Sequence, residues 1–211
     1  MEIDPEMQRE LARRAKAVLR KRARALRNTF PPAALAERSG RIVEKLRALP
    51  VVQAAGSLSL FWPIEQRNEV DLRALDVALR GEGKRIAYPS IDADTREMVF
   101  RWVDAPADME ERGHGFREPA PETPLAEQVA VGFVPPLAVD GRGFRLGYGA
   151  GFYDRTLPRY RPPARAVAVI FDFQLAPELP VGPTDVAVDT IVTDTRMLEA
   201  EPDPEAEAPP P

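Results

Sequence analysis

Glycine is concentrated in one short stretch of the chain that could hold an anion. Five of the 13 glycines lie within positions 141–151, namely Gly141, Gly143, Gly147, Gly149 and Gly151. Glycine lets backbone N–H groups approach an anion closely, and the first turn of a helix that follows adds a partial positive charge. A phosphate site fits this spacing, although neither a Walker loop nor the GxGxxG pattern is present. Plain turns are also rich in glycine, so the spacing alone leaves both interpretations open.

Asp154 follows this stretch directly, near the start of a predicted helix at residues 152–159. A carboxylate beside bound phosphates is a typical ligand of Mg²⁺, whose remaining positions are filled by water. An acidic residue in the first turn also stabilises a helix through its dipole, without any ligand. Taken alone, the position of Asp154 favours the second explanation.

Basic residues are concentrated near the N-terminus of an otherwise acidic chain. The net charge is −4, yet residues 7–30 contain nine Lys and Arg against one Glu, and five acids lie from Glu199 onward. A basic segment in an acidic chain indicates a local anion site rather than a general nucleic-acid surface. A nucleic-acid-binding module that uses this arginine-rich segment stays open as an alternative.

Composition excludes several kinds of site. The chain has no cysteine and one histidine, His114, which excludes disulfides, thiolate nucleophiles and multi-histidine metal centres. We assign His114 to a loop, without a catalytic role. The longest apolar runs are far below the roughly 20 residues that cross a bilayer, and no signal peptide is visible. We therefore expect a soluble, cytoplasmic protein with no membrane partner.

Alternating helices and strands must position these residues. Helical spacing predicts a first helix at residues 7–28 whose apolar stripe faces the core: Met7, Leu11, Ala15, Val18, Leu19 and Leu26. Further helices are predicted at 33–49 and 70–80, a long connection at 104–127, and apolar strands at 55–62, 85–88, 98–103, 129–134, 166–171 and 190–193. This alternation predicts a three-layer α/β/α sandwich with a mostly parallel sheet.

The length of 211 residues suits a single domain with less ordered ends. We expect a flexible lead at residues 1–8 and a domain at residues 9–197. The remaining residues, 198–211, are acidic and rich in proline, which predicts a disordered tail.

The glycine stretch resembles a known family. Residues 145–155, RLGYGAGFYDR, are similar to the pattern RLGYGKGYYDR of 5-formyltetrahydrofolate cyclo-ligases, also called methenyltetrahydrofolate synthetases. Further segments resemble blocks of the same family in the same order, at residues 16–20, 68–71, 83–89, 116–119 and 183–189. The resemblance covers about residues 13–197.

This resemblance implies an ATP- and Mg²⁺-dependent enzyme that cyclises 5-formyltetrahydrofolate to 5,10-methenyltetrahydrofolate and releases ADP and phosphate. ATP phosphorylates the formyl oxygen, the folate N10 attacks, and phosphate leaves. Because the substrate supplies the nucleophile, a protein without cysteine is compatible with this chemistry. The implied partners are these small molecules, with no nucleic acid, and the implied assembly is a monomer.

By position, the resemblance places ATP against Lys16, Arg20 and one loop. Lys16 and Arg20 are one helical turn apart and can converge on one phosphate group. The implied loop residues are Arg145, Leu146, Gly147, Tyr148, Gly149, Ala150, Gly151, Phe152 and Tyr153. Arg145, as a charge clamp, and Tyr153 are the implied catalytic residues. We interpret the other basic residues of the stripe as a solvated face: Arg9, Arg13, Arg24 and Arg27.

The resemblance also implies metal and folate contacts. Asp154 and Asp189 match the family's Mg²⁺ positions, and Glu69 matches an acid that contacts folate. Trp62 is expected as a wall beside Glu69, while Phe152 and Tyr153 lie where the family has a tyrosine pair between nucleotide and folate. For Trp62 and Phe152, a role as core aromatics stays equally open.

The sequence departs from the family pattern at several positions. Ala150 replaces a loop lysine, Phe152 replaces the first tyrosine, Thr184 replaces a histidine, and the turn at residues 65–68 is slightly longer. These departures keep open a binding protein of the same fold without turnover. An enzyme of the sugar-phosphate isomerase type, on a related layout, is a further alternative.

Overall fold

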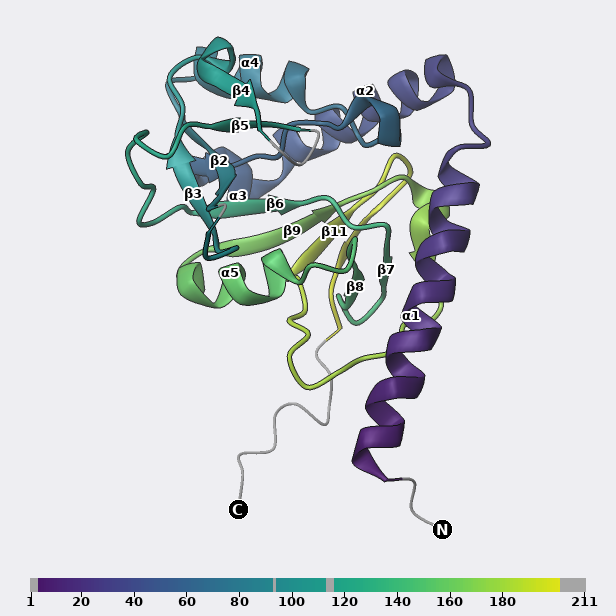
Figure 1. The fold of residues 1–211 in the computed structure, drawn as a ribbon. Helices are drawn as coiled ribbons and strands as arrows, with labels where there is room; N and C mark the ends of the chain where they lie inside the picture. Colours follow the sequence, from purple (N-terminus) through teal and green to yellow (C-terminus); the bar gives the residue numbers. More distant parts are fainter. Residues whose placement is uncertain (1–3, 93, 113–115, 202–211) are drawn as a thin grey trace.

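The computed structural model describes residues 4–92, 94–112 and 116–201 (Figure 1). His114, which the sequence placed in a loop, lies outside these residues. Proline is the first residue of three of the helices, where the missing N–H costs no hydrogen bond. The helices are α1 (Pro5–Arg27), α2 (Pro32–Ala48), α3 (Pro50–Ala54), α4 (Arg73–Gly81) and α5 (Phe152–Tyr160).

A seven-stranded sheet forms the centre of the structure, in the order β12–β11–β9–β6–β1–β2–β3. Its strands are β1 (Ser57–Ser59), β2 (Arg85–Ile91), β3 (Met98–Trp102), β6 (Val131–Val134), β9 (Arg165–Val169), β11 (Thr190–Val192) and β12 (Met197–Glu199). The inner strands are parallel, whereas β3 and β12 join the two edges in antiparallel pairing. Parallel strands are buried on both faces, which explains the continuous apolar runs of the sequence.

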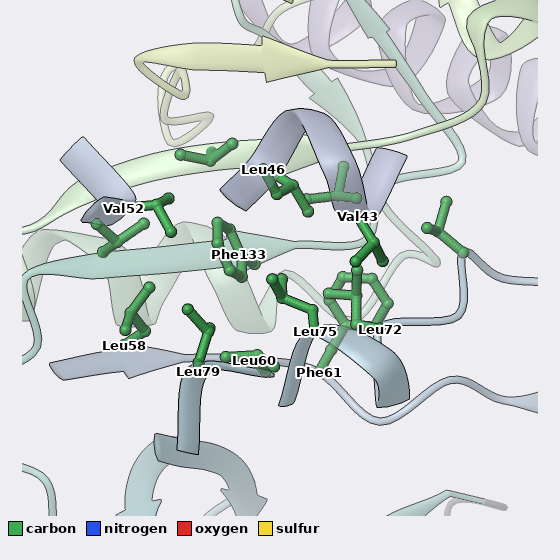
Figure 2. Close-up of a cluster of buried hydrophobic side chains, with 14 of the residues drawn as sticks. Val43, Leu46, Val52, Leu58, Leu60, Phe61, Leu72, Leu75, Leu79 and Phe133 are labelled. Carbon is green, nitrogen blue, oxygen red and sulfur yellow. The ribbon is translucent and has the colours of Figure 1, made fainter. Parts of the chain in front are cut away.

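Helices α2, α3 and α4 cover one face of this sheet (Figure 1). Leu58 of β1, Leu60 just after it and Phe133 of β6 pack there with Leu46 of α2 and Leu75 of α4 (Figure 2). Each of these side chains is at most 1% exposed. Full burial of such a side chain stabilises the fold by about 1.5–3 kcal/mol, which makes this cluster the main core.

Helix α5 covers the opposite face of the sheet (Figure 1). Its Leu157 packs there with Val134, Ala168 and Ile191 of the strands. With helices on both faces of a mostly parallel sheet, the predicted three-layer α/β/α sandwich is confirmed.

Two smaller sheets occupy the long connections. One contains β7 (Ala138–Asp140), β8 (Arg145–Leu146) and β10 (Leu175–Ala176), and the other pairs β4 (Met109–Glu111) with β5 (Arg117–Pro119). The turn between β7 and β8 uses Gly143 with φ +84°, where an added Cβ would lie 2.5 Å from the Val188 carbonyl oxygen. This tight turn sets the direction in which the chain enters the following glycine loop.

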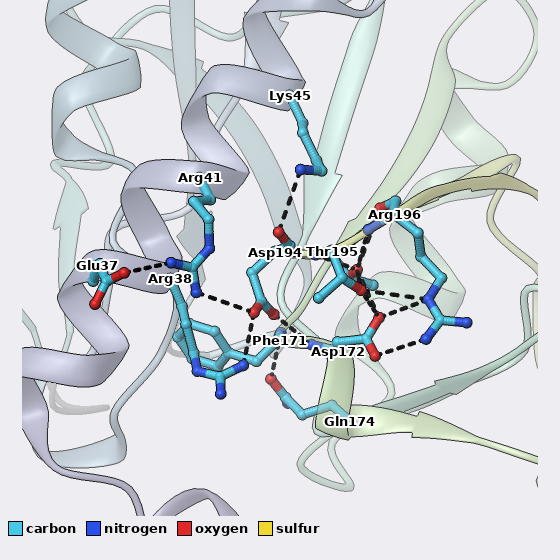
Figure 3. Close-up of polar contacts among 11 residues, drawn as sticks. Glu37, Arg38, Arg41, Lys45, Phe171, Asp172, Gln174, Asp194, Thr195 and Arg196 are labelled. Carbon is cyan, nitrogen blue, oxygen red and sulfur yellow. Dashed lines mark hydrogen bonds and ion pairs between the residues drawn. The ribbon is translucent and has the colours of Figure 1, made fainter.

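A polar cluster fastens α2 to the carboxyl ends of β9 and β11 (Figure 3). Arg38 donates to the buried carboxylate of Asp194 at 2.7 Å, and Lys45 donates to the Asp194 carbonyl at 3.3 Å. Asp172 accepts two bonds from Arg196, at 2.8 and 2.9 Å. Since these cations already have oxygen partners within the protein, the cluster is a structural clamp.

Helix α1 presents a different face to the protein from the one predicted. Met7, Leu11, Val18 and Leu26 are 57, 51, 52 and 45% exposed, so the prediction that this stripe faces the core is wrong; of the stripe, Leu19 packs inward. The inward face instead carries Lys16, Arg20 and Arg27, all of which have partners in the fold. Arg27 is 3% exposed, which also corrects its assignment to a solvated face. Helical periodicity identifies the apolar stripe and the basic stripe equally well, but it does not show which of them packs against the domain. The basic stripe packs inward because its cations bond to oxygen atoms of distant segments.

The ends of the ordered region extend slightly beyond the expected domain. Helix α1 begins at Pro5, within the segment expected as a flexible lead. Strand β12 includes Leu198 and Glu199, which the sequence placed in the tail. Glu199 accepts a bond from Arg165 at 3.1 Å, so edge pairing continues past the expected boundary. Among the described helices, none is long and apolar enough to span a membrane.

Candidate active site

A cavity of about 770 Å³ opens where the strand order reverses. From β1 the chain continues to β2 on one side, while β6 lies on the other side of β1. Residues that follow the carboxyl ends of these strands line the cavity: Trp62 after β1, and Pro135 and Pro136 after β6. Open α/β sheets bind their ligands at such a topological switch point. The fold therefore places the cavity where a substrate site is expected.

The glycine loop forms one wall of this cavity, between β8 and α5. Gly149 has φ +114° and Gly151 has φ +66°, a left-handed conformation that favours glycine. Gly151 is also the N-cap residue of α5, so the free N–H groups of the first helical turn begin at the cavity. The sequence prediction of a glycine loop that leads into a helix is confirmed, and the loop can approach an anion with its backbone.

Two cations of α1 meet this loop and the segment after β10. Lys16 donates a hydrogen bond to the carboxylate of Asp185, which also accepts from the Gly182 N–H at 2.7 Å. Arg20 donates from Nε to the Gly147 carbonyl at 2.9 Å. Both cations line the cavity, so the structure brings Lys16 and Arg20 to the predicted loop.

Arg145 and Asp154 form an ion pair at the base of the loop. The Arg145 Nη2 donates to Asp154 Oδ1 at 2.8 Å, and the Arg145 side chain is 3% exposed. Its Nη1 donates to the Val186 carbonyl, and the Val186 N–H donates to Asp154 Oδ1 at 3.2 Å. Burial lowers the pKa of Arg145, and the charge of Asp154 opposes that shift. Two of the predicted site residues are thus in direct contact.

A buried carboxylate lies elsewhere on the cavity wall. Glu69 is 9% exposed and accepts bonds from the Tyr148 hydroxyl at 2.5 Å and from the Ile64 N–H at 2.9 Å. Burial raises the pKa of Glu69, while these donors and the charges of Arg27 and Arg67 lower it. Tyr148 therefore belongs to the predicted ATP loop and also touches the predicted folate acid.

The cavity is flanked by aromatic and apolar side chains. Trp62 lies edge-on to Tyr88, with ring centroids 6.1 Å apart, and the Arg117 guanidinium lies 5.7 Å from the Trp62 ring. Phe152 and Tyr153 line the cavity, and burial raises the pKa of Tyr153. Further apolar lining comes from Phe61, Pro89, Ile91, Met98 and Phe116. A planar, largely apolar ring system fits such a surface.

Two predicted residues do not line the cavity. Leu146 is 2% exposed and packs in a small apolar cluster with Ala138 and Leu179. Asp189 accepts from Arg161 at 2.7 Å with Oδ1 and from the Ala166 N–H at 2.7 Å with Oδ2. The structure therefore does not bring Asp189 into the cavity with Asp154, because its two oxygens bond Arg161 at the end of α5 and Ala166 of β9.

Sequence reasoning missed several cavity residues. Asp185 and Arg67 line the cavity, and Arg155 donates to the Ala150 carbonyl at 2.8 Å beside it. Asp185 lies in the segment 183–189 that resembled the family, which was the available signal. Nothing in local spacing pointed to Arg67. Among the described residues, no group of three or more His, Cys, Asp or Glu side chains could hold a metal by itself.

Comparison with known proteins identifies the family of this chain. The sequence profile of the 5-formyltetrahydrofolate cyclo-ligase family matches residues 12–194. The chain belongs to the 5-formyltetrahydrofolate cyclo-ligase family. The predicted membership is confirmed, and the protein is an enzyme of this ligase family.

Similar proteins cover most of this cyclo-ligase family chain. The 5-formyltetrahydrofolate cyclo-ligase of Mycolicibacterium smegmatis is 35% identical over 156 residues, which is 72% of this chain and 74% of the relative. The Escherichia coli K12 protein of the same name is 27% identical over 188 residues, covering 86% of this chain and 100% of the relative. The structure of Aquifex aeolicus 5,10-methenyltetrahydrofolate synthetase superimposes with a TM-score of 0.77 at 28% identity, covering 89% of this chain and 94% of that one.

Proposed function

We propose that this cyclo-ligase family member uses ATP to convert 5-formyltetrahydrofolate to 5,10-methenyltetrahydrofolate, releasing ADP and phosphate. The observation that carries the proposal is one cavity that combines cations on a glycine loop with an apolar wall and a buried carboxylate. The cationic part suits the triphosphate of ATP, and the apolar part suits a pterin ring. Both substrates would then share one space, as phosphoryl transfer between them requires.

The proposed reaction needs positioning more than protein nucleophiles. The formyl oxygen attacks the γ-phosphorus of ATP, and the bond to the ADP oxygen breaks. The folate N10 then attacks the activated formyl carbon and loses its proton, and the formyl oxygen leaves with the phosphate. Because the substrate supplies both nucleophiles, the protein has to align the groups and neutralise charge.

The cations of the cavity are proposed to bind the phosphates. Lys16 and Arg20 present charge from one face of α1, and Arg145 presents it from the base of the loop. Arg145 is the proposed charge clamp on the transferred group, where a fixed cation stabilises developing negative charge. Tyr153, which lines the cavity at the start of α5, is proposed as the residue between the two substrates.

The carboxylates of the cavity fit Mg²⁺ bound together with ATP. Asp154 and Asp185 both line the cavity, and Mg²⁺ is commonly held by one or two carboxylates with phosphate oxygens and water. When bound, Mg²⁺ supplies charge neutralisation on the phosphate oxygens. We propose Asp154 as the primary ligand and Asp185 as the second, in place of Asp189.

The folate is proposed to bind along the apolar wall. Glu69 presents a carboxylate to the donors of the pterin ring, while Trp62, Phe152 and Tyr153 provide flat surfaces. Trp62 also contacts the core cluster, so the proposed folate contact would come in addition to a packing role.

An absorbance assay for methenyltetrahydrofolate tests the proposal. The purified protein is mixed with 5-formyltetrahydrofolate, ATP and Mg²⁺, and each component is omitted in turn. We expect product only in the complete mixture, with one ADP and one phosphate per product. A flat trace, with 5-formyltetrahydrofolate and ATP each bound in calorimetry, would instead establish a binding protein without turnover.

The nucleic-acid alternative loses support because Lys16, Arg20 and Arg27 turn inward and bond within the protein. The expectations of a monomer and of a cytoplasmic location stay predictions.

A further inference from the structure

A chain of hydrogen bonds connects helix α1 to the buried carboxylate of the cavity. Arg27, in the last turn of α1, donates from Nη2 to the Tyr148 hydroxyl oxygen at 2.7 Å. The Tyr148 hydroxyl in turn donates to Glu69 Oε1 at 2.5 Å. These three residues come from α1, the glycine loop and the segment after β1, which are far apart in the sequence.

The two ends of this hydrogen-bonded chain, Arg27 and Glu69, are buried, and a second arginine lies beside Tyr148. Arg27 is 3% exposed, and its Nε has no hydrogen-bond partner among the described residues. The Arg67 guanidinium lies 4.6 Å from the centre of the Tyr148 ring. Tyr148 thus contacts the guanidinium groups of Arg27 and Arg67, and burial together with the charge of Glu69 raises its pKa to about 12. The hydroxyl therefore stays protonated throughout the neutral pH range and donates a hydrogen bond to Glu69.

Glu69 retains the capacity for another partner. Its Oε2 accepts from the Ile64 N–H at 2.9 Å and its Oε1 from Tyr148. An ionised carboxylate has about four acceptor positions, and Glu69 lines the cavity. The described contacts fix the plane of the carboxylate and leave acceptor positions for a ligand.

We propose that Tyr148 and Arg27 are positioning residues that favour the ionised form of the Glu69 carboxylate and orient it toward bound folate. This inference rests on the proposed function, in which Glu69 accepts from the pterin ring. A carboxylate that is protonated or turned away offers fewer acceptors to the ring, so loss of the Tyr148 hydroxyl weakens folate binding. The two residues act through Glu69 and take no part in the chemical steps.

The titration of Glu69 gives this role a measurable signature. The groups that face Glu69 are Arg27, Arg67, Tyr148 and Tyr153. Burial raises the pKa of Glu69, and the Tyr148 hydroxyl and the two arginines lower it. Removing the Tyr148 hydroxyl therefore raises the pKa of Glu69 further. As the pH falls, activity then declines at a higher pH than in the wild-type protein.

The variant Tyr148→Phe tests the proposal, with Tyr88→Phe as a matched control. Tyr88 also donates to a buried carboxylate, Asp76 at 2.8 Å, but neither residue lines the cavity. We expect Tyr148→Phe to raise the KM and the Kd for 5-formyltetrahydrofolate about tenfold or more, as for a lost bond to a charged group. We expect the KM for ATP to change less than about twofold. The acid limb of the pH profile of kcat/KM should move to higher pH in Tyr148→Phe. In Tyr88→Phe, the folate constants and the acid limb should match the wild-type protein.

Arg27→Met and Arg27→Lys extend the test. We expect Arg27→Met to move the acid limb in the same direction, and Arg27→Lys, which keeps the charge, to restore part of the wild-type profile. If Arg27→Met does not fold, Tyr148→Phe alone decides. The proposal is overturned if Tyr148→Phe matches Tyr88→Phe in folate affinity and acid limb, or if it weakens ATP and folate equally.

Folate affinity separates this proposal from the proposed reaction. If the wild-type chain binds 5-formyltetrahydrofolate without turnover, the reaction is wrong and the Kd values of the variants still decide the positioning role. If the wild-type chain binds no folate, both proposals are wrong.

Discussion

Lys16 donates a hydrogen bond to Asp185, a residue 169 positions further along the chain. The two side chains are 15 and 18% exposed, and both line the cavity. This contact joins the basic face of α1 to the loop between β10 and β11. A bound phosphate would compete with Asp185 for the Lys16 ammonium, so the pair is a measurable link between α1 and nucleotide binding.

Replacement of the two α1 cations should weaken ATP binding selectively. We expect Lys16→Met and Arg20→Met each to raise the KM for ATP about tenfold or more, because a charge-assisted bond to phosphate is lost. The KM for 5-formyltetrahydrofolate should change less. Arg24→Met, on the same helix but exposed, is the matched control and should leave both constants unchanged. Equal losses for both substrates would indicate that the two cations only hold α1 in place.

Asp154→Asn should impair catalysis, whereas Asp189→Asn should reduce stability. Asp154→Asn removes a carboxylate from the cavity, and we expect kcat/KM to fall about 100-fold or more with a higher Mg²⁺ requirement. Asp189→Asn removes the charge that Arg161 pairs with and sets an amide donor against either Arg161 or the Ala166 N–H, outside the cavity, and we expect it to lower the free energy of unfolding by about 1–3 kcal/mol.

Mg²⁺ titrations of activity and urea unfolding measure the two effects separately. An unchanged Mg²⁺ requirement in Asp154→Asn would exclude it as a ligand. A raised Mg²⁺ requirement in a stably folded Asp189→Asn would restore the assignment that the resemblance implied.

The turn before the glycine loop should tolerate no side chain at one position. In Gly143→Ala the added Cβ would meet the Val188 carbonyl oxygen at 2.5 Å, in a backbone with φ +84°. We expect a loss of about 2–4 kcal/mol in the free energy of unfolding. Gly141→Ala is the control, since no atom lies within 4 Å of its added Cβ. Equal stability of the two variants in urea unfolding would show that the turn can relax.

The outward stripe of α1 should contribute little to stability. We expect Leu11→Ser and Val18→Ser to change the free energy of unfolding by less than about 0.5 kcal/mol, because both side chains are about half exposed. Leu46→Ala, in the main core, should cost about 2–5 kcal/mol. A loss in Leu11→Ser close to that of Leu46→Ala would mean that this stripe is covered in solution, and sedimentation would then identify a self-association.

The sequence by itself determined the inner strands of the large sheet, the longer helices and the glycine loop. Apolar runs at residues 129–134 and 166–171 predicted buried strands, and the structure has β6 (Val131–Val134) and β9 (Arg165–Val169) there, because parallel strands have both faces covered. The clustered glycines predicted the loop before α5, because left-handed conformations at Gly149 and Gly151 favour glycine. Both features depend on local preferences that a sequence pattern records directly.

Tertiary structure alone decided which partners the charged residues have. Helical spacing grouped the residues of α1 into stripes, yet the stripe that turns inward is the one whose cations meet Asp185, Gly147 and Tyr148. In the same way, Asp189 bonds to Arg161 outside the cavity, and a hydrogen bond from Tyr148 connects the glycine loop to Glu69. Periodicity shows which side chains of α1 share a face. Which of these faces packs against the domain is decided by segments more than a hundred residues away in the sequence. The carboxylate, carbonyl and hydroxyl oxygens of those segments offset the cost of burying the charges of α1.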